Sequence, residues 1–190
     1  MSIVVAVKKQ GKIIIAADSM ISFGNTVIHE DNSPVNKIYR VGGTYIGTTG
    51  WSIYDNILND YLQKQQDIDL ESRNAIFSFF INFWKTMHNE YSFVNDQSED
   101  EEKSPFADLD SEFLVVNRSG IFFVSSDMGV TQFKKFFAIG SGSSLALGAL
   151  NVLYDLALSP EEIAKAAINT AIKFNDACGG RIIMKKLDLT

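Results

Sequence analysis

The sequence has few of the residues on which disulfide, metal and triad chemistry depend. A single cysteine, Cys178, excludes an internal disulfide and gives no sign of an oxidising compartment. The two histidines, His29 and His88, stand in a polar loop and in a predicted helix, where a surface position is the simpler interpretation. They give no ligand spacing for zinc with Cys178, and no G-x-S-x-G motif lies near either of them. We therefore expect no metal, no cofactor and no Ser-His-Asp triad.

Clusters of positive charge and long apolar runs are also missing. The net charge is −6 and the pI about 4.9, and lysine and arginine are never grouped beyond pairs. The electrostatic footprint of a nucleic-acid-binding or membrane-surface protein is thus absent. No stretch reaches the length of a membrane span, and the first apolar run precedes Lys8 and Lys9, the reverse of the order in a secretory signal. We expect a cytoplasmic protein with neither nucleic acid nor a membrane as partner.

The overall composition is that of a folded protein. Hydrophobic residues make up 46% of the chain and charged residues 21%, far from the pattern of disorder. A chain of 190 residues is long enough for one well-buried domain and short for two. We expect a single domain over residues 1–190.

Predicted strands and helices come in blocks and do not alternate. The β-prone runs are Ile3–Lys9, Lys12–Ala17, Ile38–Val41, Thr44–Gly47, Glu112–Val116, Ile121–Ser125, Gln132–Ile139 and Arg181–Leu187. Amphipathic spacing predicts helices over 51–64, 71–93, 143–157 and 160–176, the last with Ser159 as N-cap and Pro160 at its first position. The acidic stretch 95–110 is predicted to be a loop. Such an order favours an α+β fold in which helices cover the outer faces of antiparallel sheets.

The start of the chain combines a possible nucleophile with a possible base. A strand begins at Ile3 directly behind Met1 and Ser2, so the terminus is expected to be held inside the fold. Ser2 is small enough for methionine aminopeptidase to remove Met1, which would leave a hydroxyl and a free α-amine on one residue. An α-amine titrates at about 7.7–8.0, so near neutral pH a useful fraction can accept the hydroxyl proton. The alternative is that Ser2 merely follows the start codon.

Five segments in order resemble the β-type proteasome family from end to end: MSIVVAVKKQGKIIIAADS, GN, NKIYRVGGTYIGTTG, FFAIGSGSSLALGAL and LSPEEIAKAAINTAI. The chain looks most similar to the small bacterial proteasome homologues (BPH), and next to HslV, the peptidase partner of an unfolding ATPase. The resemblance implies the Ntn-hydrolase fold, a four-layer αββα sandwich with two stacked antiparallel sheets. It also implies a self-compartmentalising peptidase, a homo-oligomeric double ring that cleaves unfolded polypeptides and has an unfolding ATPase as a possible partner.

The resemblance assigns three central positions. Ser2 takes the place of the N-terminal nucleophilic threonine, and Asp18 that of an aspartate that pairs with a lysine. Lys37 matches that lysine, whose positive charge helps to lower the proton affinity at the nucleophile. Ungapped counting from HslV places Pro34 there instead, so Lys37 requires a longer loop before it and a shorter hairpin after it.

Further assignments concern the surroundings of the nucleophile. Gly47 matches the glycine whose backbone N–H forms the oxyanion hole. Tyr45, in the same segment, is expected to bind substrate. Ser141 matches the serine that hydrogen-bonds near the terminal amine.

Two departures from the family pattern bear on activity. Serine in place of threonine loses the methyl group that restricts the side-chain rotamer. The family's Asp-x-x-Ser-Gly reads Asn175-Asp176-Ala177-Cys178-Gly179 here, and Asp176 is expected to compensate by a shift of one residue. A catalytically silent ring subunit, serving as scaffold or gate, is therefore the alternative to the peptidase, and a small-amide hydrolase on the same fold is a third possibility.

Overall fold

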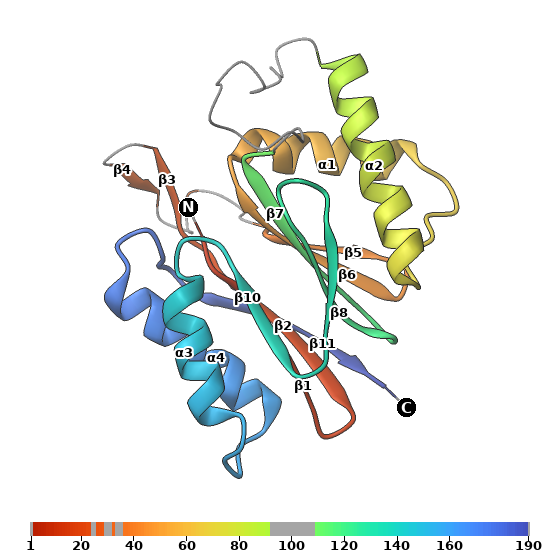
Figure 1. Ribbon diagram of the computed structural model, residues 1–190. Coiled ribbons are helices and arrows are strands. Elements are labelled where there is room, and N and C mark those ends of the chain that lie inside the picture. The colour runs from red at the N-terminus through yellow and green to blue at the C-terminus, as the bar shows by residue number, and fades with distance from the viewer. Residues whose placement is uncertain (1, 24–25, 29–31, 33–35, 92–108, 190) are drawn as a thin grey trace.

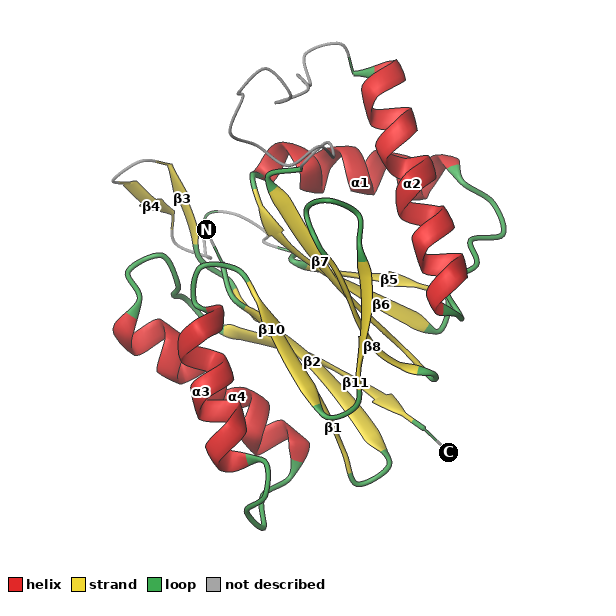
Figure 2. Ribbon diagram, in the orientation of Figure 1, coloured by secondary structure: helices red, strands yellow, loops and turns green. Residues whose placement is uncertain are grey.

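Two β-sheets pack face to face, and each carries a pair of helices on its outer side (Figure 1). The computed structural model describes residues 2–23, 26–28, 32, 36–91 and 109–189. The succession of layers is helix, sheet, sheet, helix (Figure 2), which confirms the expected αββα sandwich. His29, Pro34 and most of the predicted acidic loop lie outside the described residues.

The first strand lies in the middle of its sheet. β1 (Val4–Lys9) is flanked by β2 (Lys12–Asp18) and β10 (Phe136–Ile139), and β11 (Ile182–Asp188) completes the order β10-β1-β2-β11. All these neighbours are antiparallel, and Val4 pairs with Ala17 on one side and Ile139 on the other. Both faces of β1 are covered, which explains why its apolar residues do not alternate with polar ones. The beginning of the chain is therefore anchored by two ladders of hydrogen bonds.

The second sheet has five antiparallel strands in chain order. They are β5 (Ile38–Val41), β6 (Thr44–Gly50), β7 (Ser111–Asn117), β8 (Gly120–Val124) and β9 (Val130–Phe133). Helices α1 (Ser52–Lys64) and α2 (Arg73–Glu90) cover this sheet, and α3 (Ser143–Leu153) and α4 (Pro160–Phe174) cover the other. A separate hairpin is formed by β3 (Ile21–Phe23) and β4 (Thr26–Ile28). Within the described residues, no helix is long and apolar enough to cross a membrane.

Three apolar layers hold the sandwich together. Side chains of α1 and α2, among them Phe80 and Phe83, pack on the five-stranded sheet. Ile163 and Ile168 of α4 pack on the outer face of the four-stranded sheet. The layer between the sheets receives alternate residues of β1 and β2, such as Val4. Because the three layers share strands, the position of β1 is fixed from both sides.

The stretch predicted as one strand over Gln132–Ile139 is two strands in two different sheets. β9 ends at Phe133, and β10 begins at Phe136 beside β1. Lys134 and Lys135 take the chain from one sheet to the other, and their exposed side chains mark the break. The β3–β4 hairpin was not predicted, because strands of three residues are too short to show a period.

Candidate active site

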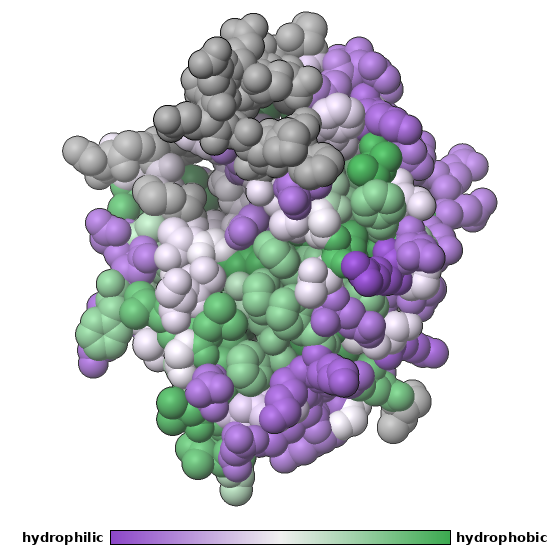
Figure 3. All heavy atoms as spheres, in the orientation of Figure 1, coloured by the Kyte–Doolittle hydropathy of each residue, from purple (hydrophilic) through white to green (hydrophobic). Residues whose placement is uncertain are grey.

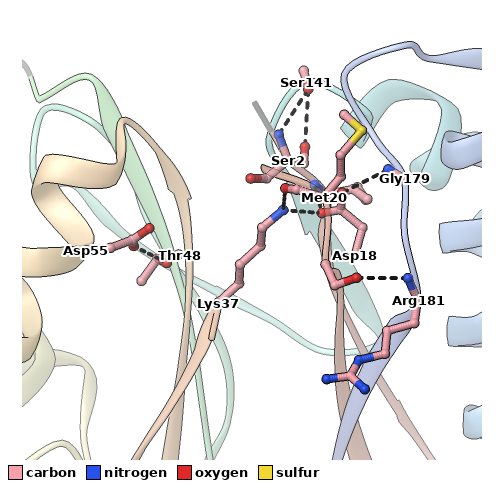
Figure 4. A network of polar contacts seen from close by, with 11 residues as sticks. Ser2, Asp18, Met20, Lys37, Thr48, Asp55, Ser141, Gly179 and Arg181 are labelled. Atoms are coloured by element: carbon pink, nitrogen blue, oxygen red, sulfur yellow. Dashed lines mark hydrogen bonds and ion pairs between the residues drawn. The ribbon is translucent and has the colours of Figure 1, made fainter. Parts of the chain in front are cut away.

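Ser2 is buried and its backbone is fixed by the loop before α3. Its side chain and backbone together are 6% exposed. The Ser2 backbone nitrogen donates to Ser141 Oγ at 3.3 Å, and the same Oγ donates to the Ser2 carbonyl oxygen at 3.2 Å (Figure 4). Gly142 N also donates to that carbonyl oxygen, at 3.4 Å. The sequence prediction that Ser141 lies at the terminal nitrogen agrees with this placement.

Gly140 allows this loop to approach the terminus closely. Its φ is +93°, and a Cβ at this position would lie 2.4 Å from the Ser2 carbonyl oxygen, so any other residue would displace Ser2. The Gly140 N–H donates to Glu112 Oε2 at 3.2 Å, which ties the loop to β7 of the other sheet. Sequence reasoning missed Glu112, because a glutamate at the start of a strand reads as an ordinary surface residue.

Asp18 and Lys37 form a buried ion pair next to Ser2. Lys37 Nζ lies 2.7 Å from Asp18 Oδ1, with side-chain exposures of 7% and 0%. The same Asp18 oxygen accepts from Ile3 N at 3.0 Å, and the other carboxylate oxygen accepts from Gly179 N at 3.0 Å. Lys37 also donates to the Met20 carbonyl oxygen at 2.8 Å. Such a set of partners is what makes a buried charge pair tolerable.

The Asp18–Lys37 pair contacts the backbone immediately after the candidate nucleophile, Ser2. Asp18 binds the amide that links Ser2 to Ile3, and Figure 4 shows the Lys37 ammonium pointing toward Asp18 and Ser2. An ammonium has three donors, of which Asp18 and Met20 take two. The structure thus places Lys37 against Asp18 beside Ser2, and the role of Lys37 in catalysis stays a prediction.

Gly47 and Tyr45 lie on β6. Gly47 is opposite Ile38 on β5 and Leu114 on β7, and a Cβ there would lie 2.6 Å from Val4 Cγ1, so the close approach of the two sheets demands glycine. Tyr45 is partly buried against the layer between the sheets. The oxyanion-hole role of Gly47 and the substrate contact of Tyr45 remain predictions.

A second acid, which is half-buried, lies across from Lys37. Asp55, in the first turn of α1, accepts a hydrogen bond from the Thr48 hydroxyl, and Thr48 N donates to the Lys37 carbonyl oxygen at 3.0 Å. Burial raises the pKa of the Asp55 carboxyl, and the hydrogen bond from Thr48 and the charge of Lys37 act in the opposite direction. Asp55 was not foreseen, because the sequence alone shows only an acidic residue near a helix start.

The segment after α4 differs from the sequence prediction. Asp176 is exposed and has no hydrogen bond or ion pair among the described residues, so the expected compensation by one position is not seen. Asn175 makes the contact instead: its Nδ2 donates to the Ser141 carbonyl oxygen at 2.9 Å. The reason is geometric, because Asn175 is the C-cap of α4 and Asp176 is already turned outward.

Cys178 is buried beside the loop that precedes α3, and its thiol is a poor alternative to Ser2 as the nucleophile. A Cβ on Gly142 would lie 2.8 Å from its Sγ. Burial, together with the nearby Asp18 carboxylate, raises the pKa of the Cys178 thiol to about 11, so at neutral pH it is the unreactive thiol. The described part of the chain contains no group of three or more His, Cys, Asp or Glu residues arranged to hold a metal ion.

The chain is similar to known proteins over most of its length. No protein-family model matches it. The ATP-dependent protease subunit HslV of Sulfurovum sp. (strain NBC37-1) is 25% identical over 171 residues, which cover 86% of this chain and 85% of that protein. The solved structure of Thiobacillus denitrificans BPH is 30% identical with a TM-score of 0.89, and the match covers 99% of this chain and 98% of that one.

Two further solved structures are similar. Thiobacillus denitrificans BPH in complex with epoxomicin matches with 29% identity and a TM-score of 0.89, over 99% of both chains. A eukaryotic HslV from Trypanosoma brucei shares the fold, with a TM-score of 0.68 and 16% identity over 98% of this chain and 99% of that one. The identity to BPH over nearly the full length of both chains shows that this chain belongs to the proteasome/HslV family of Ntn-hydrolase peptidases, in the group of the bacterial proteasome homologues.

Proposed function

We propose that the chain is an N-terminal nucleophile peptidase in which Ser2, exposed by removal of Met1, is the nucleophile. The observation that supports this most directly is the buried Asp18–Lys37 pair, which binds the amide immediately after Ser2. Ser141 holds the nitrogen and the carbonyl oxygen of Ser2 from the other side. If Ser2 merely followed the start codon, we would not expect a buried ion pair beside it. We would also not expect the Ser141 hydroxyl to bind both its nitrogen and its carbonyl oxygen.

The proposed reaction uses the two groups of Ser2 in turn. The α-amine accepts the hydroxyl proton while Ser2 Oγ attacks the carbonyl carbon of a peptide bond. The proton then passes to the leaving amine, the C–N bond breaks, and an acyl-ester on Ser2 remains. A water molecule, deprotonated by the same α-amine, attacks the ester carbonyl carbon. As the bond between that carbon and Ser2 Oγ breaks, the protonated amine returns its proton to Ser2 Oγ, and the product acid leaves as a carboxylate after losing its proton to solvent.

The neighbouring residues assist in defined ways. The Lys37 ammonium disfavours further positive charge and so lowers the proton affinity at Ser2. Ser141 orients the amine toward the hydroxyl. The Gly47 N–H is proposed to stabilise the oxyanion, a contact worth about 3–4 kcal/mol in comparable sites.

One of the similar solved structures holds a bound compound. Thiobacillus denitrificans BPH has been solved in complex with epoxomicin. We propose that the same compound binds this chain at Ser2.

Peptide cleavage by the purified protein tests the proposal. Short unstructured peptides with a quenched fluorophore are expected to be cleaved, each cut producing a new α-amine and a new carboxylate. A protein that lacks Met1, is correctly assembled and leaves all such peptides intact would instead be the silent ring subunit.

Assembly into a homo-oligomeric double ring, with an unfolding ATPase as a possible partner, is a second part of the proposal. Large apolar side chains remain exposed outside the three core layers, among them Phe77 on α2 at 47%, Val152 on α3 at 68% and Phe174 on α4 at 68%. Apolar residues also gather in the middle of the face seen in Figure 3, where β8 and β10 lie in Figure 1. Apolar surface of this kind marks contacts between proteins.

Sedimentation velocity at micromolar concentration measures the assembly. We expect a species many times heavier than the 21.1 kDa chain. A single boundary at the mass of one chain would contradict the ring.

A further inference from the structure

We propose that Glu112 determines part of the substrate specificity: its carboxylate binds a lysine or arginine side chain of the substrate, on the leaving-group side of the cleaved bond. The inference rests on the proposed function and names a substrate class for the same site. Its basis is the placement of one carboxylate of the five-stranded sheet against the loop that holds Ser2.

Glu112 is brought to the site by the pairing of β6 with β7. It lies opposite Thr49 in the register of these strands, and the Ser111 hydroxyl donates to the Thr49 carbonyl oxygen at 2.7 Å, which fixes this end of the pair. Glu112 Oε2 accepts a hydrogen bond from the Gly140 N–H at 3.2 Å. A Cβ on Gly140 would lie 2.4 Å from the Ser2 carbonyl oxygen. A single residue therefore separates the Glu112 carboxylate from the Ser2 backbone.

One oxygen of the Glu112 carboxylate remains open. Oε2 accepts from Gly140 N, whereas Oε1 has no hydrogen-bond or ion-pair partner among the described residues. Within that part of the chain no buried side-chain polar atom lacks a partner, so Oε1 is accessible to solvent, although Glu112 as a whole is half-buried. A carboxylate that is oriented through one oxygen and open at the other is suited to bind an ammonium or guanidinium group.

The other two acids near Ser2 are already engaged by the protein. The charge of Asp18 is balanced by Lys37 at 2.7 Å, and Asp55 accepts a hydrogen bond from the Thr48 hydroxyl. Glu112 forms no ion pair with any cation in the described part of the chain. Its negative charge is thus available to attract a cationic group of a substrate and to repel an anionic one.

The position of Glu112 indicates which side of the substrate it meets. In the proposed reaction the α-amine of Ser2 passes a proton to the leaving amine, so the leaving group must lie on the side of that amine. The Ser2 nitrogen is bound by Ser141, the residue that directly follows Gly140. Glu112 binds Gly140 and therefore borders the leaving-group side. Lysine and arginine carry their charge at the end of a long side chain, which can reach the carboxylate from the first two residues after the cut.

The test compares two quenched fluorescent peptides that differ only in the two residues after the cleaved bond, lysine in one and glutamate in the other. Mass spectrometry of the products fixes the position of the cut. For the wild type we expect kcat/KM to be roughly tenfold higher with the lysine peptide at low salt, and the difference to shrink as salt rises.

Glu112→Gln retains an acceptor for the Gly140 N–H and removes only the charge. The kcat/KM ratio of the two peptides should then fall to near one, because the lysine peptide is cleaved more slowly and the glutamate peptide faster. Damage to the loop alone would slow both. Asp67→Asn removes the same charge from an exposed position between α1 and α2 and is expected to keep the wild-type ratio.

A second readout does not depend on catalysis. In the Ser2→Ala protein, fluorescence anisotropy of a labelled lysine peptide should show binding that Glu112→Gln weakens severalfold. Ser2-dependent cleavage with the same peptide ratio in the wild type and in Glu112→Gln would overturn the inference and leave the proposed function intact. Loss of assembly in Glu112→Gln would also overturn it, because the open oxygen would then bind a neighbouring copy. Absence of cleavage by assembled protein that lacks Met1, with peptide binding still dependent on Glu112, would instead overturn the proposed function alone.

Discussion

Replacing Ser2 by alanine is expected to reduce peptide cleavage to background, a loss on the order of 10⁴-fold or more. The substitution removes the attacking hydroxyl and nothing else of importance. The contacts that fix Ser2 in the structure are made by its backbone nitrogen and carbonyl oxygen, and alanine keeps both. The assembly should therefore form as in the wild type while hydrolysis of a fluorogenic peptide stops.

Ser2→Thr is the matched control for this experiment. Threonine restores the hydroxyl and adds the methyl group that limits rotation about χ1. We expect Ser2→Thr to retain activity, at or above the level of the wild type. Wild-type rates in Ser2→Ala, measured on assemblies of unchanged sedimentation, would show that the nucleophile lies elsewhere.

Replacing Lys37 by alanine is expected to lower kcat/KM by about 10²-fold or more, because the site loses the cation that lowers the proton affinity at Ser2. The same change leaves Asp18, which is 0% exposed, as an unpaired buried carboxylate. Removing one partner of a buried pair costs about 3–5 kcal/mol of folding stability. Both losses are measurable, the first with a fluorogenic peptide and the second by denaturant unfolding.

Two further variants separate activity from stability at this position. The double variant Asp18→Asn with Lys37→Ala removes the unpaired charge, so it should recover stability relative to Lys37→Ala but remain inactive. Lys64→Ala, which breaks only exposed ion pairs with Asp60 and Glu90, should change neither. An assembled Lys37→Ala protein with the wild-type rate would remove Lys37 from the mechanism.

The position of the terminus and of Lys37 could be predicted from sequence for different reasons. The apolar run from Ile3 has no polar alternation, which is the pattern of a strand buried on both faces, and β1 is indeed central in its sheet. Lys37 has no such periodic signal. Its placement came only from the resemblance, and the buried contact with Asp18 supplies the physical reason for it.

Other features depend on tertiary contacts that no local sequence pattern indicates. The run from Gln132 to Ile139 is β-prone throughout, and only the packing of the two sheets shows that it divides between them. The choice between Asn175 and Asp176 depended on where α4 ends, which a sequence period fixes only to within a few residues. Glu112 reaches the site from the other sheet, and no local motif marks it.

The most direct test of the central claim is the mass of the purified chain before and after incubation with epoxomicin, followed by mapping of the modified residue. We expect a chain shorter by one methionine that gains the mass of one epoxomicin molecule, located on Ser2 and absent from Ser2→Ala. An active protein that retains Met1, or a modification that persists in Ser2→Ala, would contradict it.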